Sequence, residues 1–409
     1  MFFDRLAFRV AGTTDFAKLF TWIPQMLLQF IFFWPKQKTY LKTVLFAIAM
    51  VFLIFINVGL AVEFSSTFDD LVRFVMHVTY ITVTVQGTAK TLVIYINNGE
   101  LEVILDDIMT KFWPYDLLET KLKKELKSFY YVIVIIMISL VTFGVLYSSM
   151  IMITPWASRK FPFDVSYPNI DYNASPYYEL IYLVQIFTIQ YFLFCLVLGC
   201  DYSFLAICSC VIAQYKLLQN ALMAFHTPLM EEVNRKLRRI GNDGLEGKMY
   251  PIHKEYFIRC VNHHHLLLGI TKKMNSMFSS IEMVQLSCSM TGVCIGLFSL
   301  TALEDPPVSS LVIILSFTAI YFNELFVYCA IGNELHYQAS FLPEFVFKSN
   351  WNELADKELT RDFMFMLQRS QDIPQLSAYN LYDINMESYI KVFKLSFSFY
   401  TFLTTMKEK

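Results

Sequence analysis

The chain has 409 residues, of which 56% are hydrophobic, 17% aromatic and 17% charged. Soluble domains carry roughly one quarter charged residues, and a compact soluble core has no room for 39 Phe and 24 Tyr. The net charge of −2 gives no sign of a nucleic-acid partner or an acidic tail, so the composition predicts an all-α, polytopic membrane protein.

Seven stretches are suited to crossing a bilayer, which takes about 20 mainly apolar residues. We expect these spans at 41–61, 71–96, 129–153, 178–203, 283–303, 309–331 and 385–406. Residues 1–40 are expected to be a cytosolic segment that holds an interfacial or re-entrant helix, LFTWIPQMLLQFIFFWP. Because apolar helical patterns continue past the fourth span and precede the fifth, residues 204–282 are expected to extend both helices into the cytosol.

The placement of lysine and arginine predicts the orientation of the chain. Twenty-five of the 33 lie in the segments 1–42, 97–128, 204–282 and 332–384, and only five lie on the opposite side. The amino terminus is therefore predicted to be intracellular and the carboxyl terminus extracellular, which is the reverse of a metabotropic seven-helix receptor. The one glycosylation sequon, at Asn173, falls in a predicted outer loop, and all eight cysteines lie in spans or on the inner side.

Motifs of enzymes, metal sites and cofactor sites are missing from the chain, including the phosphate-binding glycine loop, H-E-x-x-H and C-x-x-C. We therefore predict neither an enzyme nor a cofactor or metal site. The run His263–His265 is interpreted as a polar cytosolic helix face, because adjacent histidines on a helix point in different directions.

Charged residues inside predicted spans are costly and therefore informative. Glu324 lies well inside the sixth span, and Lys391 and Lys394 lie at a comparable depth in the seventh. We expect Glu324 to neutralise one of these lysines in an inner vestibule. The alternative is that the lysines reach water independently.

The last span carries a polar stripe with heptad spacing, made of Lys391, Lys394, Ser398, Thr401 and Thr405. A helix surrounded by lipid gains nothing from such a stripe, whereas a helix that faces a water-filled pore does. Several copies of the helix around an axis would be needed to enclose the pore. The alternative is that the hydroxyls bond to their own backbone or across a protein interface.

Two stretches near the carboxyl terminus resemble the signature of insect odorant receptors. They read FVYCAIGNELHYQASFLPEFVFKSNWNEL and FMLQRSQDIPQLSAYNLYDINMESYIKVFKLSFSFYTFLTT. The matching residues are Tyr328, Cys329, Gly332, Leu335, Ser340, Trp351, Arg369, Ser370, Gln371, Lys394, Ser396, Ser398 and Tyr400. The chain lacks the long insertion between the fourth and fifth helices that marks the co-receptor, and the terminal motif typical of gustatory receptors. It is similar to an odorant-tuning subunit.

This resemblance implies an odorant-binding subunit of a heteromeric, ligand-gated, non-selective cation channel. Such a subunit assembles with co-receptor subunits as a hetero-tetramer in the plasma membrane of a sensory neuron dendrite. The resemblance would place a cytosolic anchor in the segments 204–282 and 332–384. The first four spans, in 41–203, would form the ligand-pocket side, and 283–331 would hold the fifth and sixth spans. A gustatory-type channel is the alternative, and a metabotropic receptor is the weaker one.

The resemblance also implies that residues 385–409 line the pore and form an extracellular tail. Matching chain ends places an apolar gate at Phe402, with Leu403 as the neighbouring register. The pore and gate residues would be Ser398, Thr401, Phe402, Thr405 and Met406. Two features depart from the family: Phe402 is bulky for a conducting ring, and Lys391 and Lys394 suit a cation path only in a wide vestibule or in pairs.

An odorant pocket is implied in the outer half of helices two to six. The high aromatic content favours small aromatic or heteroaromatic volatiles. Ordinary helix packing is the alternative at each position. The residues at a suitable depth are His77, Tyr80, Ile81, Gly144, Val145, Ser148, Ile189, Phe192, Phe317, Thr318 and Tyr321.

Overall fold

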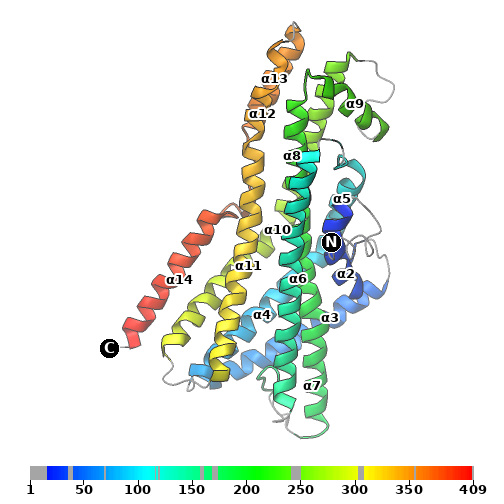
Figure 1. Cartoon of the computed structure of the whole chain (residues 1–409). Coiled ribbons are helices and arrows are strands. Elements are labelled where there is room, and N and C mark those ends of the chain that lie inside the picture. The colour runs from blue at the N-terminus through cyan, green and yellow to red at the C-terminus, as the bar shows by residue number, and fades with distance from the viewer. Residues whose placement is uncertain are drawn as a thin grey trace.

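The computed structural model describes residues 16–35, 40–68, 71–115, 117, 120–156, 161–167, 174–240, 250–302, 308–353 and 356–407. Nearly all of these residues are helical, and the long helices run alongside one another in an elongated bundle (Figure 1). The prediction of an all-α fold is confirmed.

The helices follow one another along the chain with short connections. The amino-terminal half contains α2 (Phe16–Phe30), α3 (Tyr40–Phe64), the short turn η1 (Ser65–Thr67), α4 (Leu71–Ile96), α5 (Asn98–Lys111) and α6 (Thr120–Trp156). Next come α7 (Tyr177–Phe187), the π-helical segment η2 (Thr188–Phe194), α8 (Cys195–Met223), α9 (Pro228–Ile240), α10 (Ile252–Ala302) and α11 (Val308–Ser340). The carboxyl-terminal part contains α12 (Leu342–Lys348), η3 (Asn350–Glu353), α13 (Lys357–Ser370), the antiparallel pair β1 (Ser377–Ala378) and β2 (Tyr382–Asp383), and α14 (Met386–Lys407).

Each predicted span falls on a helix, namely α3, α4, α6, the continuous α7–η2–α8, α10, α11 and α14. Among the described residues, five stretches are long and apolar enough by themselves to cross a membrane: Tyr40–Phe64, Lys124–Thr142, Cys195–Met223, Ile252–Leu300 and Ile314–Glu353. The helices α4 and α14 are not among these five stretches. The orientation of the bundle stays a prediction.

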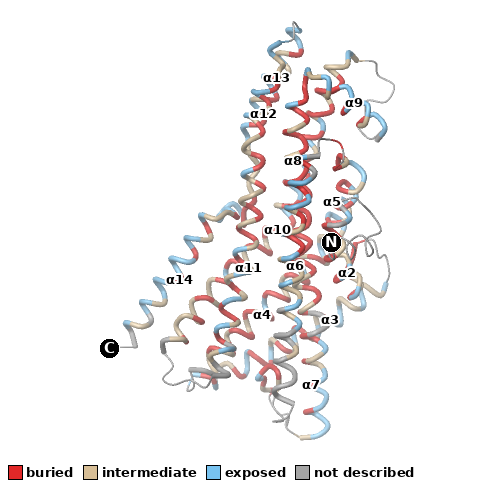
Figure 2. The backbone as a smooth tube through the Cα atoms, viewed as in Figure 1, coloured by how far each residue is buried: buried red, intermediate tan, exposed pale blue. Residues whose placement is uncertain are grey.

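Helix α8 forms the centre of the bundle. It is buried along most of its length and packs against α2, α4, α10 and α11 (Figure 2). As expected from the sequence, α8 continues well beyond its predicted span, to Met223, and α10 begins well before its own, at Ile252. Helix α11 also continues past its predicted end, to Ser340, and these three extensions gather with α9, α12 and α13 at one end of the molecule (Figure 1).

The aromatic amino-terminal segment forms α2, which buries one face against α8. Leu27 and Leu28 are buried in this contact, whereas the ring of Phe20 packs on Phe129 and Tyr130 of α6. Gly199 of α8 allows the close approach, because a Cβ at this position would stand 2.7 Å from the side chain of Leu28.

Two of the three histidines do not lie on the polar face that we expected, although His265 is exposed. His263 and His264 are each only 3% exposed, and the ring of His263 stacks on Trp113 with 4.1 Å between the ring centroids. Gln214 of α8 holds the Trp113 peptide, because its amide nitrogen donates to the carbonyl oxygen at 2.9 Å and its amide oxygen accepts from the peptide N–H at 3.1 Å. The α5–α6 connection therefore covers His263, a tertiary contact that local sequence does not reveal.

Candidate functional site

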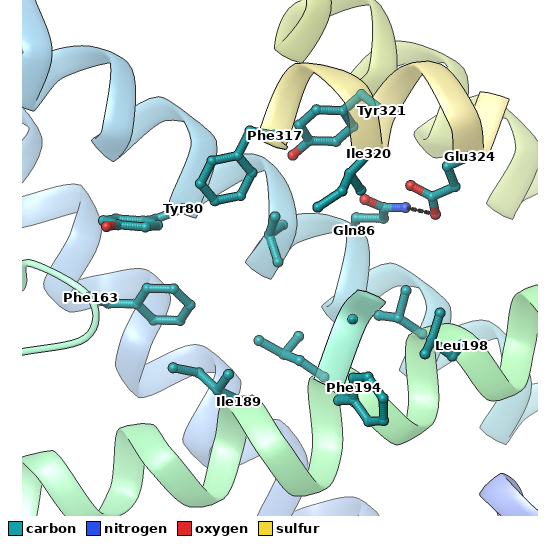
Figure 3. Close-up of a pocket in the computed structure, with 14 residues that line it drawn as sticks. Tyr80, Gln86, Phe163, Ile189, Phe194, Leu198, Phe317, Ile320, Tyr321 and Glu324 are labelled. Carbon is teal, nitrogen blue, oxygen red and sulfur yellow. Dashed lines mark hydrogen bonds between the residues drawn. The ribbon is translucent and has the colours of Figure 1, made fainter. Parts of the chain in front are cut away.

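A cavity of about 180 Å³ lies between α4, α6, η2, α8 and α11 (Figure 3). Most of its walls are apolar, and a dry apolar cavity of about 150 Å³ is large enough to bind benzene. The space therefore suits a molecule with about one ring. The lining residues are Tyr80, Val83 and Gln86 of α4; Gly144 of α6; Phe163 of the connection 161–167; Ile189, Leu193 and Phe194 of η2; Val197 and Leu198 of α8; and Phe317, Ile320, Tyr321 and Glu324 of α11.

The π-helical segment η2 supplies one wall of this cavity. A π turn is wider than an α turn and shifts the register of the side chains that follow it. Ile189, Leu193 and Phe194 reach the cavity from this segment. Gly144 leaves room for Phe194, since a Cβ on Gly144 would stand 2.8 Å from the edge of that ring.

The eleven predicted pocket residues divide into three groups. Five of them line the cavity: Tyr80, Gly144, Ile189, Phe317 and Tyr321. The side chains of Ser148 and Phe192 lie outside the described residues. Whether any of these residues binds an odorant stays a prediction.

The remaining four predicted residues do not line the cavity. His77 is buried and donates from Nε2 to the carbonyl oxygen of Leu60 at 2.7 Å, and Ile81 packs beside the cavity without lining it. Val145 is 42% exposed, and Thr318 lines a smaller space beside Gly292 and Gly296. Ile81, Val145 and Thr318 each follow a lining residue directly and so point to another face of the helix, whereas His77 turns toward the Leu60 carbonyl.

Sequence reasoning missed several lining residues that share a helix face with a predicted one. Val83 and Gln86 follow Tyr80 at three-residue steps, and Ile320 and Glu324 continue the face of Phe317. This periodicity could have identified them. Phe163 comes from the connection 161–167, where no periodic pattern operates.

A buried ionic network lies at one end of the cavity. The ammonium of Lys90, with a side chain only 1% exposed, stands 2.6 Å from Asp201 Oδ1 and 2.8 Å from Glu324 Oε1. The Tyr328 hydroxyl donates to Asp201 Oδ1 at 2.6 Å, and Gln86 Nε2 donates to Glu324 Oε1 at 2.6 Å. The network therefore joins α4, α8 and α11 through one shared cation.

This network corrects the predicted charge pair. The cation at Glu324 is Lys90 and not Lys391 or Lys394. Lys391 instead pairs with the exposed Glu387 at 2.7 Å, and Lys394 is exposed. The reason is the orientation of α14, which buries Val392 against the bundle and leaves both lysines off that face.

The polar stripe of α14 lies on its outer surface. Lys391, Lys394, Ser398, Thr401 and Thr405 are all exposed, and Phe402 is 60% exposed. The Thr401 hydroxyl donates to Ser398 O and the Thr405 hydroxyl to Thr401 O, each at 2.8 Å. These two hydroxyls therefore bond to their own helix backbone, as the alternative interpretation of the stripe expects. The side chains of Leu403 and Met406, and residue Asn173, lie outside the described residues.

Comparison with known proteins places the chain in a receptor family. A family model described as 7tm Odorant receptor matches residues 70–397. Odorant receptor 30a of Drosophila melanogaster is 24% identical over 260 residues, which are 60% of this chain and 60% of that protein. Odorant receptor 10 of Aedes albopictus is 22% identical over 245 residues, with the same shares. The chain thus matches about 60% of the length of these relatives.

The fold is also that of solved insect olfactory receptors. The receptor OR5 of Machilis hrabei in complex with eugenol superposes with a TM-score of 0.75 at 13% identity, over 94% of this chain and 98% of that one. A second structure of OR5 from Machilis hrabei superposes with a TM-score of 0.74 at 15% identity, over 95% of this chain and 98% of that one. The family model covers well over half of the chain, so this chain belongs to the seven-transmembrane odorant receptor family, whose members are receptors and not enzymes.

Proposed function

We propose that this chain is the odorant-binding subunit of a heteromeric, ligand-gated, non-selective cation channel in the plasma membrane of olfactory neurons. The observation that carries the proposal is the aromatic and aliphatic cavity of about 180 Å³ inside the helix bundle. Burial of apolar surface contributes about 25 cal/mol per Å², which is how such a cavity retains a small volatile with few polar contacts. The shared fold of OR5 from Machilis hrabei, solved with eugenol, supports this choice.

We propose that α14 lines the pore in an assembly with co-receptor subunits. Its outer face carries the polar stripe together with the exposed Phe397 and Phe402, and a helix surrounded only by lipid gains nothing from such a stripe. Phe402 is the proposed gate, and 204–282 together with 332–384 form the proposed cytosolic anchor. Asn173 is the proposed glycosylation site on the outer side.

Odorant-evoked current is expected only when this chain is expressed together with an insect co-receptor. Whole-cell recording under a panel of volatiles would measure it, and cells with either subunit alone are the controls. A non-selective cation current from the pair supports the proposed tuning subunit. A response to soluble tastants and to no volatile would instead favour the gustatory alternative.

Filling the cavity is expected to weaken that response. Val83→Phe adds a ring inside the cavity and is expected to raise the half-maximal odorant concentration at least about tenfold, which corresponds to about 1.4 kcal/mol of binding free energy. Val145→Phe makes the same change on an exposed α6 position outside the cavity and is the matched control. Surface labelling would show that both variants reach the membrane. Equal responses from both variants would contradict the location of the pocket.

A further inference from the structure

The cavity has two chemically different ends. Aromatic rings of Tyr80, Phe163 and Phe317 surround one end, whereas Gln86 and Glu324 stand together at the other (Figure 3). Gln86 is only 4% exposed, although its side chain is an uncharged amide that requires hydrogen-bond partners.

The hydrogen bonds of Gln86 leave one atom unused. Its amide nitrogen donates to Gln285 Oε1 and, at 2.6 Å, to Glu324 Oε1, which uses both N–H groups. Within the described part of the chain, no group donates to Gln86 Oε1. This oxygen is turned away from Glu324 in Figure 3, on the side of Ile320. Amide oxygens inside folded proteins usually have a donor, and because Gln86 lines the cavity, a ligand there could supply the donor for this oxygen.

The other polar groups nearby offer no donor to a ligand. Lys90 does not line the cavity, and its ammonium is held between the carboxylates of Asp201 and Glu324. The Tyr321 hydroxyl shares a hydrogen bond of 2.5 Å with Thr82. The Tyr80 hydroxyl lies at the end of its ring that is remote from Gln86 (Figure 3). The polar end of the cavity can therefore accept a hydrogen bond but is poorly placed to donate one.

We propose that this cavity prefers small single-ring volatiles that carry one O–H donor, namely aryl alcohols and phenols. The hydroxyl donates to Gln86 Oε1, and the ring packs between Tyr80, Phe163 and Phe317. Volatiles that can only accept a hydrogen bond meet an amide oxygen and a carboxylate there, and purely apolar volatiles leave Gln86 Oε1 unpaired. The proposal rests on the proposed function, since it names the ligand class of the same cavity.

Three ligands of almost equal size separate these cases. Benzyl alcohol carries a donor, benzaldehyde only accepts, ethylbenzene does neither, and all have the same number of non-hydrogen atoms. The purified full-length chain would be unfolded thermally in detergent at rising concentrations of each, because a ligand of the native state raises the unfolding temperature according to its affinity. One added hydrogen bond predicts roughly three- to tenfold tighter binding of benzyl alcohol. Equal affinities, tighter binding of benzaldehyde, or no stabilisation by any of the three would overturn the proposal.

A variant tests the acceptor itself. Gln86→Met keeps the length of the side chain but removes the amide oxygen, and is expected to reduce the affinity for benzyl alcohol to that for ethylbenzene. Ile81→Met makes a similar change on the same helix, at a residue that packs beside the cavity without lining it, and is expected to preserve the preference for benzyl alcohol. Retention of that preference in Gln86→Met would count against the assignment. Since the wild-type series needs no variant, the proposal stays testable even if Gln86→Met does not fold.

The binding experiment tests the ligand class, and the current recordings test the proposed function, so a negative result in one can be told apart from a negative result in the other. Loss of the benzyl alcohol preference, with odorant currents that Val83→Phe still weakens, would overturn this inference and leave the proposed function in place. A clear preference in a chain that gives no current with any co-receptor would support the ligand class and contradict the channel.

Discussion

Lys90→Met is expected to remove most of the folded protein from the cell surface. The substitution leaves Asp201 and Glu324 facing each other inside the bundle, where they now share one ammonium at 2.6 and 2.8 Å. Breaking a buried ion pair by removing one partner costs about 3–5 kcal/mol, because the remaining charge is left without compensation. Folded proteins are typically stable by only about 5–15 kcal/mol, so this loss is large.

The measurement is surface expression together with the thermal unfolding temperature in detergent. A triple variant, Lys90→Met with Asp201→Asn and Glu324→Gln, removes both uncompensated carboxylates and is expected to recover much of the lost stability. Lys391→Met is the matched control, since it removes a lysine whose only described ion-pair partner is the exposed Glu387, and little change is expected. The role assigned to the network would be contradicted if Lys90→Met unfolded at the wild-type temperature. It would also be contradicted if Lys90→Met and Lys391→Met lost equal amounts of stability and surface expression.

The network also marks what sequence reasoning could and could not predict about buried charges. Counting residues from the ends of the spans gave the depth of Glu324, and equal depth suggested Lys391 and Lys394. Depth does not specify which way a helix is rotated or which helices are neighbours. Lys90 is within reach because α4 packs beside both α8 and α11, an arrangement that is set by the whole bundle.

The difference between the depth of a residue and the rotation of its helix also explains which pocket residues could be predicted. The long apolar patterns were sufficient to predict the helices and the extension of α8 and α10, because length and hydrophobicity are local properties of the sequence. Tyr80 and Phe317 have both the right depth and the right face, whereas His77 has the depth and turns instead toward the Leu60 carbonyl. The π-helical register of η2 could not be read from the sequence, and it decides which side chains reach the cavity from this segment.

Gly332→Ala is expected to displace the start of α14 and to abolish odorant-evoked current. Gly332 belongs to the carboxyl-terminal signature and lies in α11, where a Cβ would overlap the carbonyl oxygen of Ile384 and stand 2.9 Å from its Cγ2. That carbonyl cannot rotate aside as a side chain would, because the Ile384 N–H donates to Leu376 O at 2.9 Å and Ile384 directly follows β2. Overpacking of this kind costs about 1–3 kcal/mol.

Gly269→Ala provides the matched control, because Gly269 is also inside a long helix and a Cβ there would meet nothing within 4 Å. Alanine is preferred over glycine in a helix interior by about 1 kcal/mol, so this variant is expected to unfold at the same or a higher temperature and to keep its current. A lower unfolding temperature and lost current in Gly332→Ala alone would show that the close approach of α11 to the Ile384 backbone positions the last helix. If Gly332→Ala instead behaved like Gly269→Ala, the start of α14 would be free to move without loss of function, and the glycine of the signature would need another explanation.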